Sequence, residues 1–196
     1  MNYRYMLLFL IVPFFVQAQT LTQRQQAFQS VLNKSKTSEL KIKKAEDLAR
    51  DKRSKFRVDA INYLIDQKSV SSGPIIASLI RDDDVREFAI YGVGELGVYE
   101  ATPLVIKALK DENHNNRGNA YRALQKMYPQ DFNFEFHYDD PPHVRAQIIK
   151  NIESWWKTNR NRLKNMSMQE KTDKEKKEAE ERWDKYGKEY LERQTP

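Results

Sequence analysis

The sequence predicts an all-α protein, a short right-handed α-solenoid of helix pairs followed by a long charged C-terminal helix. Residues 74–82 read PIIASLIRD and residues 103–111 read PLVIKALKD, so proline, apolar residues, a basic residue and aspartate recur at a spacing of 29. A second apolar-periodic segment follows each block, REFAIYGV at 86–93 and RGNAYRAL at 117–124. Two helical segments in each unit of a fixed period indicate a stack of helix pairs.

An arginine begins the second segment of each predicted unit. These arginines are Arg57, Arg86, Arg117 and Arg145, at separations of 29, 31 and 28 residues. Apolar residues follow them at helical spacing, which places those residues on one face. Alanine stands three residues after the first three arginines, at positions 60, 89 and 120. A side chain this small allows paired helices to approach closely.

Local signals support the predicted helices. Pro74 and Pro103 suit a first helical turn, where a missing N–H is not needed. Asp84 precedes Val85 and is the expected N-cap of the next helix. No strand precedes the glycines of YGVGELG, so we interpret them as close helix packing at Gly92 and a helix C-cap at Gly97, and not as a phosphate-binding loop.

The order of Asp82, Val85, Arg86 and Ala89, with Leu-Gly at 96–97 and then PLVIKALKD, resembles bacterial HEAT-like repeats of the short type, also seen in phycobilisome lyases. The resemblance covers roughly residues 38–156. It implies that the recurring arginines and aspartates support the turns between helices and stack between repeats. The residues to which this role is carried are Arg86, Asp82, Arg117 and Asp111, with Arg57 and Arg145.

Residues 1–18 form a predicted secretory signal peptide. Arg4 precedes an apolar run over residues 6–16 that is short for a membrane span, and Val16-Gln17-Ala18 fits a cleavage site before Gln19. An uncleaved anchor is the alternative. We expect the mature chain to be periplasmic or secreted and to have no integral membrane segment. The chain has no cysteine, which excludes disulfides and thiolate metal sites.

Residues 19–37 are expected to form an N-terminal capping helix, and residues 38–160 the HEAT-like repeat domain, beginning with helices at roughly 38–50 and 55–67. Residues 129–142, PQDFNFEFHYDDPP, interrupt the repeat and predict an extended loop whose aromatic side chains cover the end of the array. A helix follows from His143, and its Trp155 and Trp156 are expected to cap the hydrophobic column. An exposed aromatic platform for carbohydrate or peptide is the alternative.

Residues 161–196 form a predicted charged helical tail, with one long helix over about 163–193. Glu170 and Lys174 are one of its stabilising i,i+4 pairs. Trp183, Tyr186 and Tyr190 share a narrow stripe, so we expect them to dock on the repeat domain or on a partner. A sustained heptad pattern is lacking, which argues against an independent coiled coil.

No arrangement of residues indicates catalysis. Recognisable Ser-His-Asp, Cys-His and paired-carboxylate motifs are missing from the sequence. The spacing of His137, Asp139, Asp140 and His143 matches no zinc signature, so we predict no metal site and no cofactor. A secretory signal also argues against the lyase activity of the resembling proteins, which act on a cytoplasmic chromophore.

The sequence therefore predicts an exported, non-enzymatic scaffold that binds a protein or peptide through its helical-repeat surface. Nucleic acid is not an expected partner outside the cytoplasm. The candidate surface residues are Asn62, Glu87, Tyr91, Asn119 and Arg122, together with the three tail aromatics. One alternative is an envelope polyanion-binding protein, because residues 19–58 carry a net charge of +7. Its candidate residues are Lys41, Lys43, Lys44, Lys52, Arg53 and Lys55. A lyase-like accessory protein is the other alternative.

Overall fold

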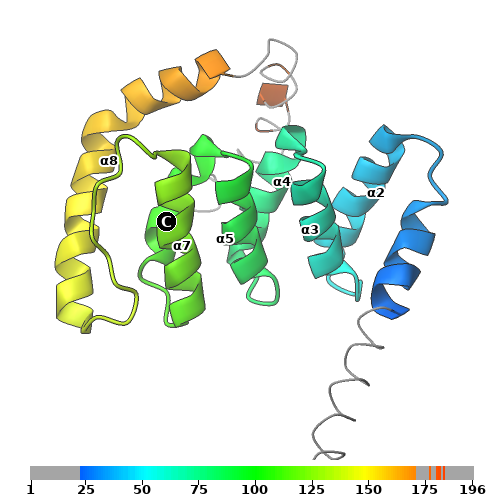
Figure 1. Cartoon of the computed structure of the whole chain (residues 1–196), viewed down its shortest axis with the longest axis horizontal. Helices are drawn as coiled ribbons and strands as arrows, with labels where there is room; N and C mark the ends of the chain where they lie inside the picture. The colour runs from blue at the N-terminus through cyan, green and yellow to red at the C-terminus, as the bar shows by residue number, and fades with distance from the viewer. Residues whose placement is uncertain (1–22, 171–176, 178–179, 182, 184–196) are drawn as a thin grey trace, which may run out of the picture.

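The structure is a computed structural model that describes residues 23–170, 177, 180–181 and 183 (Figure 1). The described residues contain helices and no strand, so the all-α prediction is confirmed. A helix over residues 23–32 precedes the labelled ones. These are α2 (Ser38–Arg50), α3 (Arg57–Asp66), α4 (Gly73–Ser78), α5 (Arg86–Glu95), α6 (Thr102–Ala108), α7 (His114–Met127) and α8 (Pro142–Glu170).

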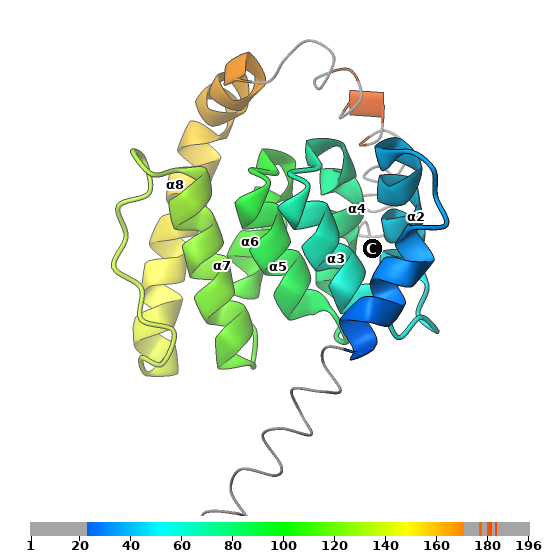
Figure 2. The same ribbon diagram turned by 45° about the vertical axis from the view of Figure 1, so that its right-hand side comes forward.

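The helices pair and stack as the period predicts. The pairs are α2–α3, α4–α5 and α6–α7, and α5 packs against both α3 and α7. Figures 1 and 2 show the second helices α3, α5 and α7 side by side in one row, with α4 and α6 in the layer behind them. The chain is therefore a short helical solenoid, in which each repeat contacts its neighbours.

The prolines and the small polar residues begin helices where their chemistry suits that position. Pro74 and Pro103 lie in the first turns of α4 and α6, where the absent N–H leaves no hydrogen bond unmade. The Thr37 side chain accepts the backbone N–H of Leu40 and caps α2. Asn113 caps α7 in the same way through the backbone N–H of Asn115.

The predicted N-cap of α5 is wrong. The N-cap residue is Val85, and no side chain makes a capping hydrogen bond there. The carboxylate of Asp82 instead accepts the backbone N–H of Asp84, and the carboxylate of Asp111 accepts that of Asn113. The repeated aspartates thus organise the turns between helices, which is the role implied by the resemblance.

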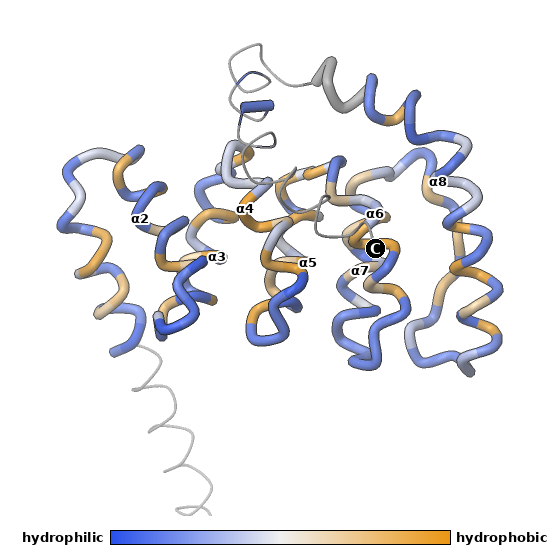
Figure 3. Tube along the Cα trace, turned by 180° about the vertical axis from the view of Figure 1, so that it is seen from behind, coloured by the Kyte–Doolittle hydropathy of each residue, from blue (hydrophilic) through white to orange (hydrophobic). Residues whose placement is uncertain are grey.

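The hydrophobic core consists of buried side chains from the stacked helices and runs along the whole array. Ala60, Ala89 and Ala120 are each 0% exposed, which confirms their predicted place in close helix contacts. A Cβ atom on Gly92 would lie 3.0 Å from the Ile76 side chain, and Gly97 ends α5 with a φ of 61°. Both glycine interpretations are therefore confirmed. Figure 3 shows hydrophobic residues concentrated around α4 and α5, with hydrophilic residues at the loops.

The C-terminal part of the array has one unexpected feature. The predicted loop is present between α7 and α8, but α8 continues without a break across residues 160–161 to Glu170. We expected a separate tail helix from about residue 163. The aromatic residues of α8 and its charged continuation therefore belong to one helix. Within the described part of the chain, no helix combines the length and the apolar character needed to cross a membrane.

Candidate protein-interaction surface

An arginine in the first turn of each second helix ties one repeat to the next. Arg57 is only 6% exposed, and its Nε donates to the carbonyl oxygen of Ala49 at 3.0 Å. One Nη of Arg57 also donates to a carboxylate oxygen of Asp82 at 2.7 Å, across the boundary between the first and second repeats. The hydrogen bond from Arg57 lowers the pKa of Asp82, against the opposing effect of burial.

The same arrangement recurs along the array. Arg86 donates to the carbonyl oxygen of Ile80 at 2.9 Å and to the carboxylate of Asp111 at 3.3 Å. Arg117 donates to the carbonyl oxygen of Tyr138 at 2.7 Å and thereby holds the loop that follows α7. We call this series the arginine ladder. It fixes the spacing of the second helices, because each guanidinium binds groups of two successive units.

The candidate residues on the second helices lie on three successive helices of the row. Asn62 on α3 and Arg122 on α7 are exposed, whereas Glu87 and Asn119 are half-buried. Tyr91 on the middle helix α5 is 46% exposed. The arrangement presents one aromatic ring between polar neighbours, and tyrosine is among the side chains enriched at protein interfaces.

Charged residues near this face are held in ion pairs. Arg24 donates to Asp59 at 2.8 Å, and Lys126 binds Glu95 between α7 and α5. These exposed pairs contribute little to stability individually. Each pair does place opposite charges side by side, so neither cation of these two pairs lies on this face without a carboxylate next to it.

The aromatic residues near the end of the array form a packed cluster. The ring of Trp155 lies 5.3 Å from that of Tyr128 and 5.5 Å from that of Phe132, in edge-on contacts. Phe132 and Phe136 are buried, while Tyr138 is 37% exposed against His114. The cluster covers the hydrophobic column, as the cap interpretation predicts, and does not form a flat exposed platform.

Tyr128 anchors this cluster through a buried hydroxyl. Thr102 uses its only hydroxyl proton to donate to the carbonyl oxygen of Tyr99 at 2.6 Å. The Tyr128 hydroxyl, 2.5 Å from the Thr102 oxygen, must therefore be the donor in that pair. Burial raises the pKa of Tyr128, which keeps this donor proton in place.

Of the three predicted tail aromatics, the structure describes Trp183. Its side chain is half-buried and packs against the hydrophobic core of the repeats, as expected for docking within the chain. Tyr186 and Tyr190 lie outside the described residues.

The candidate polyanion-binding residues fall into two groups. Lys41, Lys43 and Lys44 lie on α2, whereas the others lie in the segment between α2 and α3. Several already bind nearby groups. Lys41 donates to Asn33 at 3.0 Å, Lys52 lies 3.9 Å from Asp82, and Arg53 lies 3.6 Å from Asp51. These contacts engage part of the charge that the polyanion hypothesis requires.

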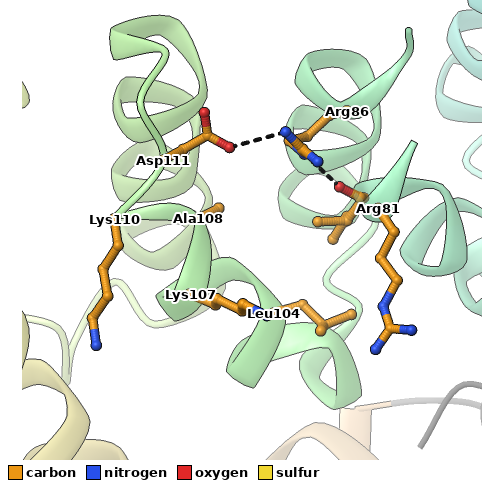
Figure 4. Close-up of a pocket in the computed structure, with 8 residues that line it drawn as sticks. Arg81, Arg86, Leu104, Lys107, Ala108, Lys110 and Asp111 are labelled. Atoms are coloured by element: carbon orange, nitrogen blue, oxygen red, sulfur yellow. Dashed lines mark hydrogen bonds and ion pairs between the residues drawn. The ribbon is translucent and has the colours of Figure 1, made fainter. Parts of the chain in front are cut away.

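A pocket that we did not predict lies between the second and third repeats (Figure 4). We call it the inter-repeat pocket. Its volume is about 410 Å³. Arg81 and Lys110 lie on opposite sides, with Leu104 and Lys107 between them. Arg86 and Asp111, the second step of the arginine ladder, form another wall.

A signal for this pocket was present in the repeat itself. The blocks PIIASLIRD and PLVIKALKD align residue by residue, and Leu79 of the first corresponds to Ala108 of the second. The same alignment replaces Ser78 by Lys107. A smaller side chain opens space and a lysine adds charge, but only the packing of neighbouring helices shows that both face one pocket.

The middle of the chain is similar to a known protein family. Residues 74–132 match the family model for HEAT repeats. That range contains α5 to α7 and all of α4 except its first residue, together with the second step of the arginine ladder and the inter-repeat pocket. No curated protein and no solved structure matches the chain.

Proposed function

Because the chain is a HEAT-like repeat protein, we propose that it is an exported, non-enzymatic scaffold that holds another protein or peptide on its helical-repeat surface. Arrays of helix pairs commonly present extended binding surfaces, since stacking places equivalent side chains at regular intervals. The observation that carries the proposal is the row of α3, α5 and α7, held by the arginine ladder, with exposed Tyr91 at its centre.

The row has the properties of a preformed interface. The ladder residues Arg57 and Arg117 are buried, so the second helices keep their spacing before a partner arrives. A surface ordered in advance loses less conformational entropy on binding than a flexible one. An exposed aromatic ring surrounded by polar groups is the usual anchor of such a surface.

The proposal is tested by capture with two matched variants. The full-length protein is immobilised and incubated with an envelope extract of the native host, and retained proteins are identified by mass spectrometry. Tyr91→Ser should lose a protein that the wild type retains. Tyr138→Ser, which alters another exposed tyrosine outside the row, should retain it. If the wild type retains nothing beyond the blank matrix, or Tyr91→Ser retains the same protein equally, the proposed surface is wrong.

Export is the part of the proposal supported by sequence alone. The short apolar run and the Val16-Gln17-Ala18 site are typical of a cleaved signal. Intact-mass measurement of the protein from the native host should give a chain that begins at Gln19 or its cyclised form. A chain that retains Met1 in the cytoplasmic fraction would contradict export.

A further inference from the structure

The inter-repeat pocket has an apolar floor that can receive a side chain. Ile80, Leu104 and Ala108 line it, and Leu104 is only partly buried. A volume of about 410 Å³ lies within the range of pockets that bind ligands in proteins. The floor is therefore large enough for one bulky apolar side chain and part of the backbone that carries it.

The pocket exists because two equivalent repeats distribute volume differently. In the second repeat, Ala77 is followed two residues later by Leu79, whereas the third repeat has Ile106 followed by Ala108. All four residues are buried. The second repeat therefore has its large side chain at Leu79, whereas the third repeat has it two positions earlier, at Ile106. This difference leaves the space beside Ala108 open.

The rim of the pocket is basic. Arg81, Lys107 and Lys110 line it. The acidic residue in the lining, Asp111, already accepts a hydrogen bond from Arg86 at 3.3 Å. Lys110 binds Glu153 at 2.6 Å, but both side chains are about half exposed, and such surface pairs exchange readily for other partners. Charge complementarity therefore favours an anionic occupant.

We propose that the inter-repeat pocket binds an acidic segment of the partner protein, with one large apolar side chain of that segment seated against Ala108. Carboxylates on either side of the apolar residue then pair with Lys107 and Lys110. This inference rests on the proposed function and names the chemistry of the partner. It places a contact on the layer of α4 and α6, whereas Tyr91 lies on α5 in the row of second helices.

The chain itself supplies the variants that test the pocket. Ala108→Leu and Lys107→Ser each introduce the residue that the second repeat has at the equivalent position. Ala108→Leu fills the floor without removing charge, and Lys107→Ser removes charge from an exposed side chain. Lys43→Ser removes an exposed lysine of α2 and is the matched control. Thermal unfolding confirms that each full-length variant is folded.

The probe is a fluorescein-labelled synthetic peptide in which one leucine is flanked on both sides by pairs of glutamate. Fluorescence polarisation should show saturable binding to the wild type and to Lys43→Ser. Ala108→Leu should weaken binding about tenfold or more, because burial of the peptide's leucine is lost. Lys107→Ser should weaken binding and reduce its dependence on salt, since one charge pair is removed.

Several outcomes would overturn the inference. No saturable binding by the wild type is one, and equal affinity for Ala108→Leu is another. A control peptide with alanine in place of leucine that binds equally well would indicate charge attraction without use of the apolar floor. If the peptide binds only after Trp183→Ser, the pocket belongs to the chain's own C-terminal segment and not to a partner.

The inference and the proposed function can fail separately. Tyr91→Ser should leave binding of the acidic peptide unchanged, because Tyr91 does not line the inter-repeat pocket. Loss of peptide binding in Tyr91→Ser would place the acidic segment elsewhere and overturn the inference. If the peptide does not bind but capture of the partner still depends on Tyr91, the proposed role of the inter-repeat pocket is wrong and the scaffold proposal stands.

Discussion

Arg57 on α3 binds Asp82, which lies 25 residues further along the chain and belongs to the next repeat. Arg86 binds Asp111 at the same sequence separation. The contact is therefore a property of the repeat and not of one site. It joins a buried guanidinium to a carboxylate that also accepts a turn N–H, so one aspartate connects the turn within its own unit to the preceding unit.

The contribution of Asp82 to stability should disappear in acid. At neutral pH we expect Asp82→Asn to cost about 2–3 kcal/mol in the free energy of unfolding, because the buried guanidinium of Arg57 loses its nearer counter-charge and keeps only the exposed carboxylate of Asp84 at 3.6 Å. Arg57 holds the pKa of Asp82 below its ordinary value of 3.8, so the native state binds fewer protons than the unfolded state. The contribution is complete above pH 3.8 and is lost as the pH falls through the native pKa.

Urea unfolding of the wild type and Asp82→Asn across this range measures the effect. The difference between their unfolding free energies should be constant near neutrality and narrow below pH 3.8. A difference that stays constant into strong acid would show that the carboxylate charge is not what stabilises this contact.

Replacing Lys68 by glycine should stabilise the protein. Lys68 follows α3 with a φ of 49°, a left-handed conformation that costs free energy for a residue with a Cβ atom. Gly97 holds the equivalent position after α5, with a φ of 61°. The backbone N–H groups of Ser69 and Val98 close matching turns onto Leu64 and Val93, at 3.0 and 2.9 Å.

We therefore expect Lys68→Gly to raise the free energy of unfolding by about 0.5–1 kcal/mol, measured by urea denaturation. The reverse substitution, Gly97→Lys, should lower it by a similar amount. No change in either variant would mean that the two turns relax without strain.

The contact between α5 and α7 should be especially sensitive to an added methyl group. A Cβ atom on Gly94 would lie 2.7 Å from both the Cα and the Cβ of Ala123, so backbone would have to move. A Cβ atom on Gly92 would meet side-chain carbons of Ile76 and Ile65 at 3.0 and 3.1 Å. Side-chain atoms can shift more easily than backbone.

Gly94→Ala should therefore destabilise the protein by about 1–3 kcal/mol, the usual range for overpacking. Gly92→Ala should cost less, because part of its clash is relieved by side-chain adjustment. The melting temperatures of the two variants decide the order. Equal or reversed values would mean that α5 and α7 can separate more freely than their packing indicates.

The half-buried ring of Trp183 should contribute to the stability of the repeat domain in the full-length chain. Its side chain packs on the hydrophobic core although it lies beyond α8. Removing it exposes apolar surface, and a large side chain gains about 1.5–3 kcal/mol from full burial, so a half-buried ring should give roughly half of that. Trp183→Ser should lower the melting temperature, whereas the exposed substitution Lys177→Ser should not. Equal melting temperatures would remove the basis for docking within the chain.

The parts of the fold that depend on local periodicity could be predicted from the order of the residues. The repeated blocks predicted the helix pairs, and the helix expected at roughly 38–50 matches the observed bounds of α2, Ser38–Arg50. The recurring arginines and aspartates were also recognisable, because a residue that serves the same turn in each unit returns at the period of the repeat. Gly97 was recognisable from its place just after a helical segment. The aromatic cap was predictable because the end of a stacked array needs a cover.

The features that depend on contacts between neighbouring helices could not be predicted in this way. Asp84 was the expected N-cap of α5. In the structure it is Asp82 that accepts a backbone N–H in the turn before α5, and Asp82 also binds Arg57 of the previous repeat. Glu87 and Asn119 are half-buried, because adjacent helices cover part of the row. The inter-repeat pocket arises from a difference between two aligned blocks, the small Ala108 in place of a leucine. A periodic pattern identifies the residues that all repeats have in common. The residues in which two repeats differ create a pocket or a charged surface only through the way neighbouring helices pack.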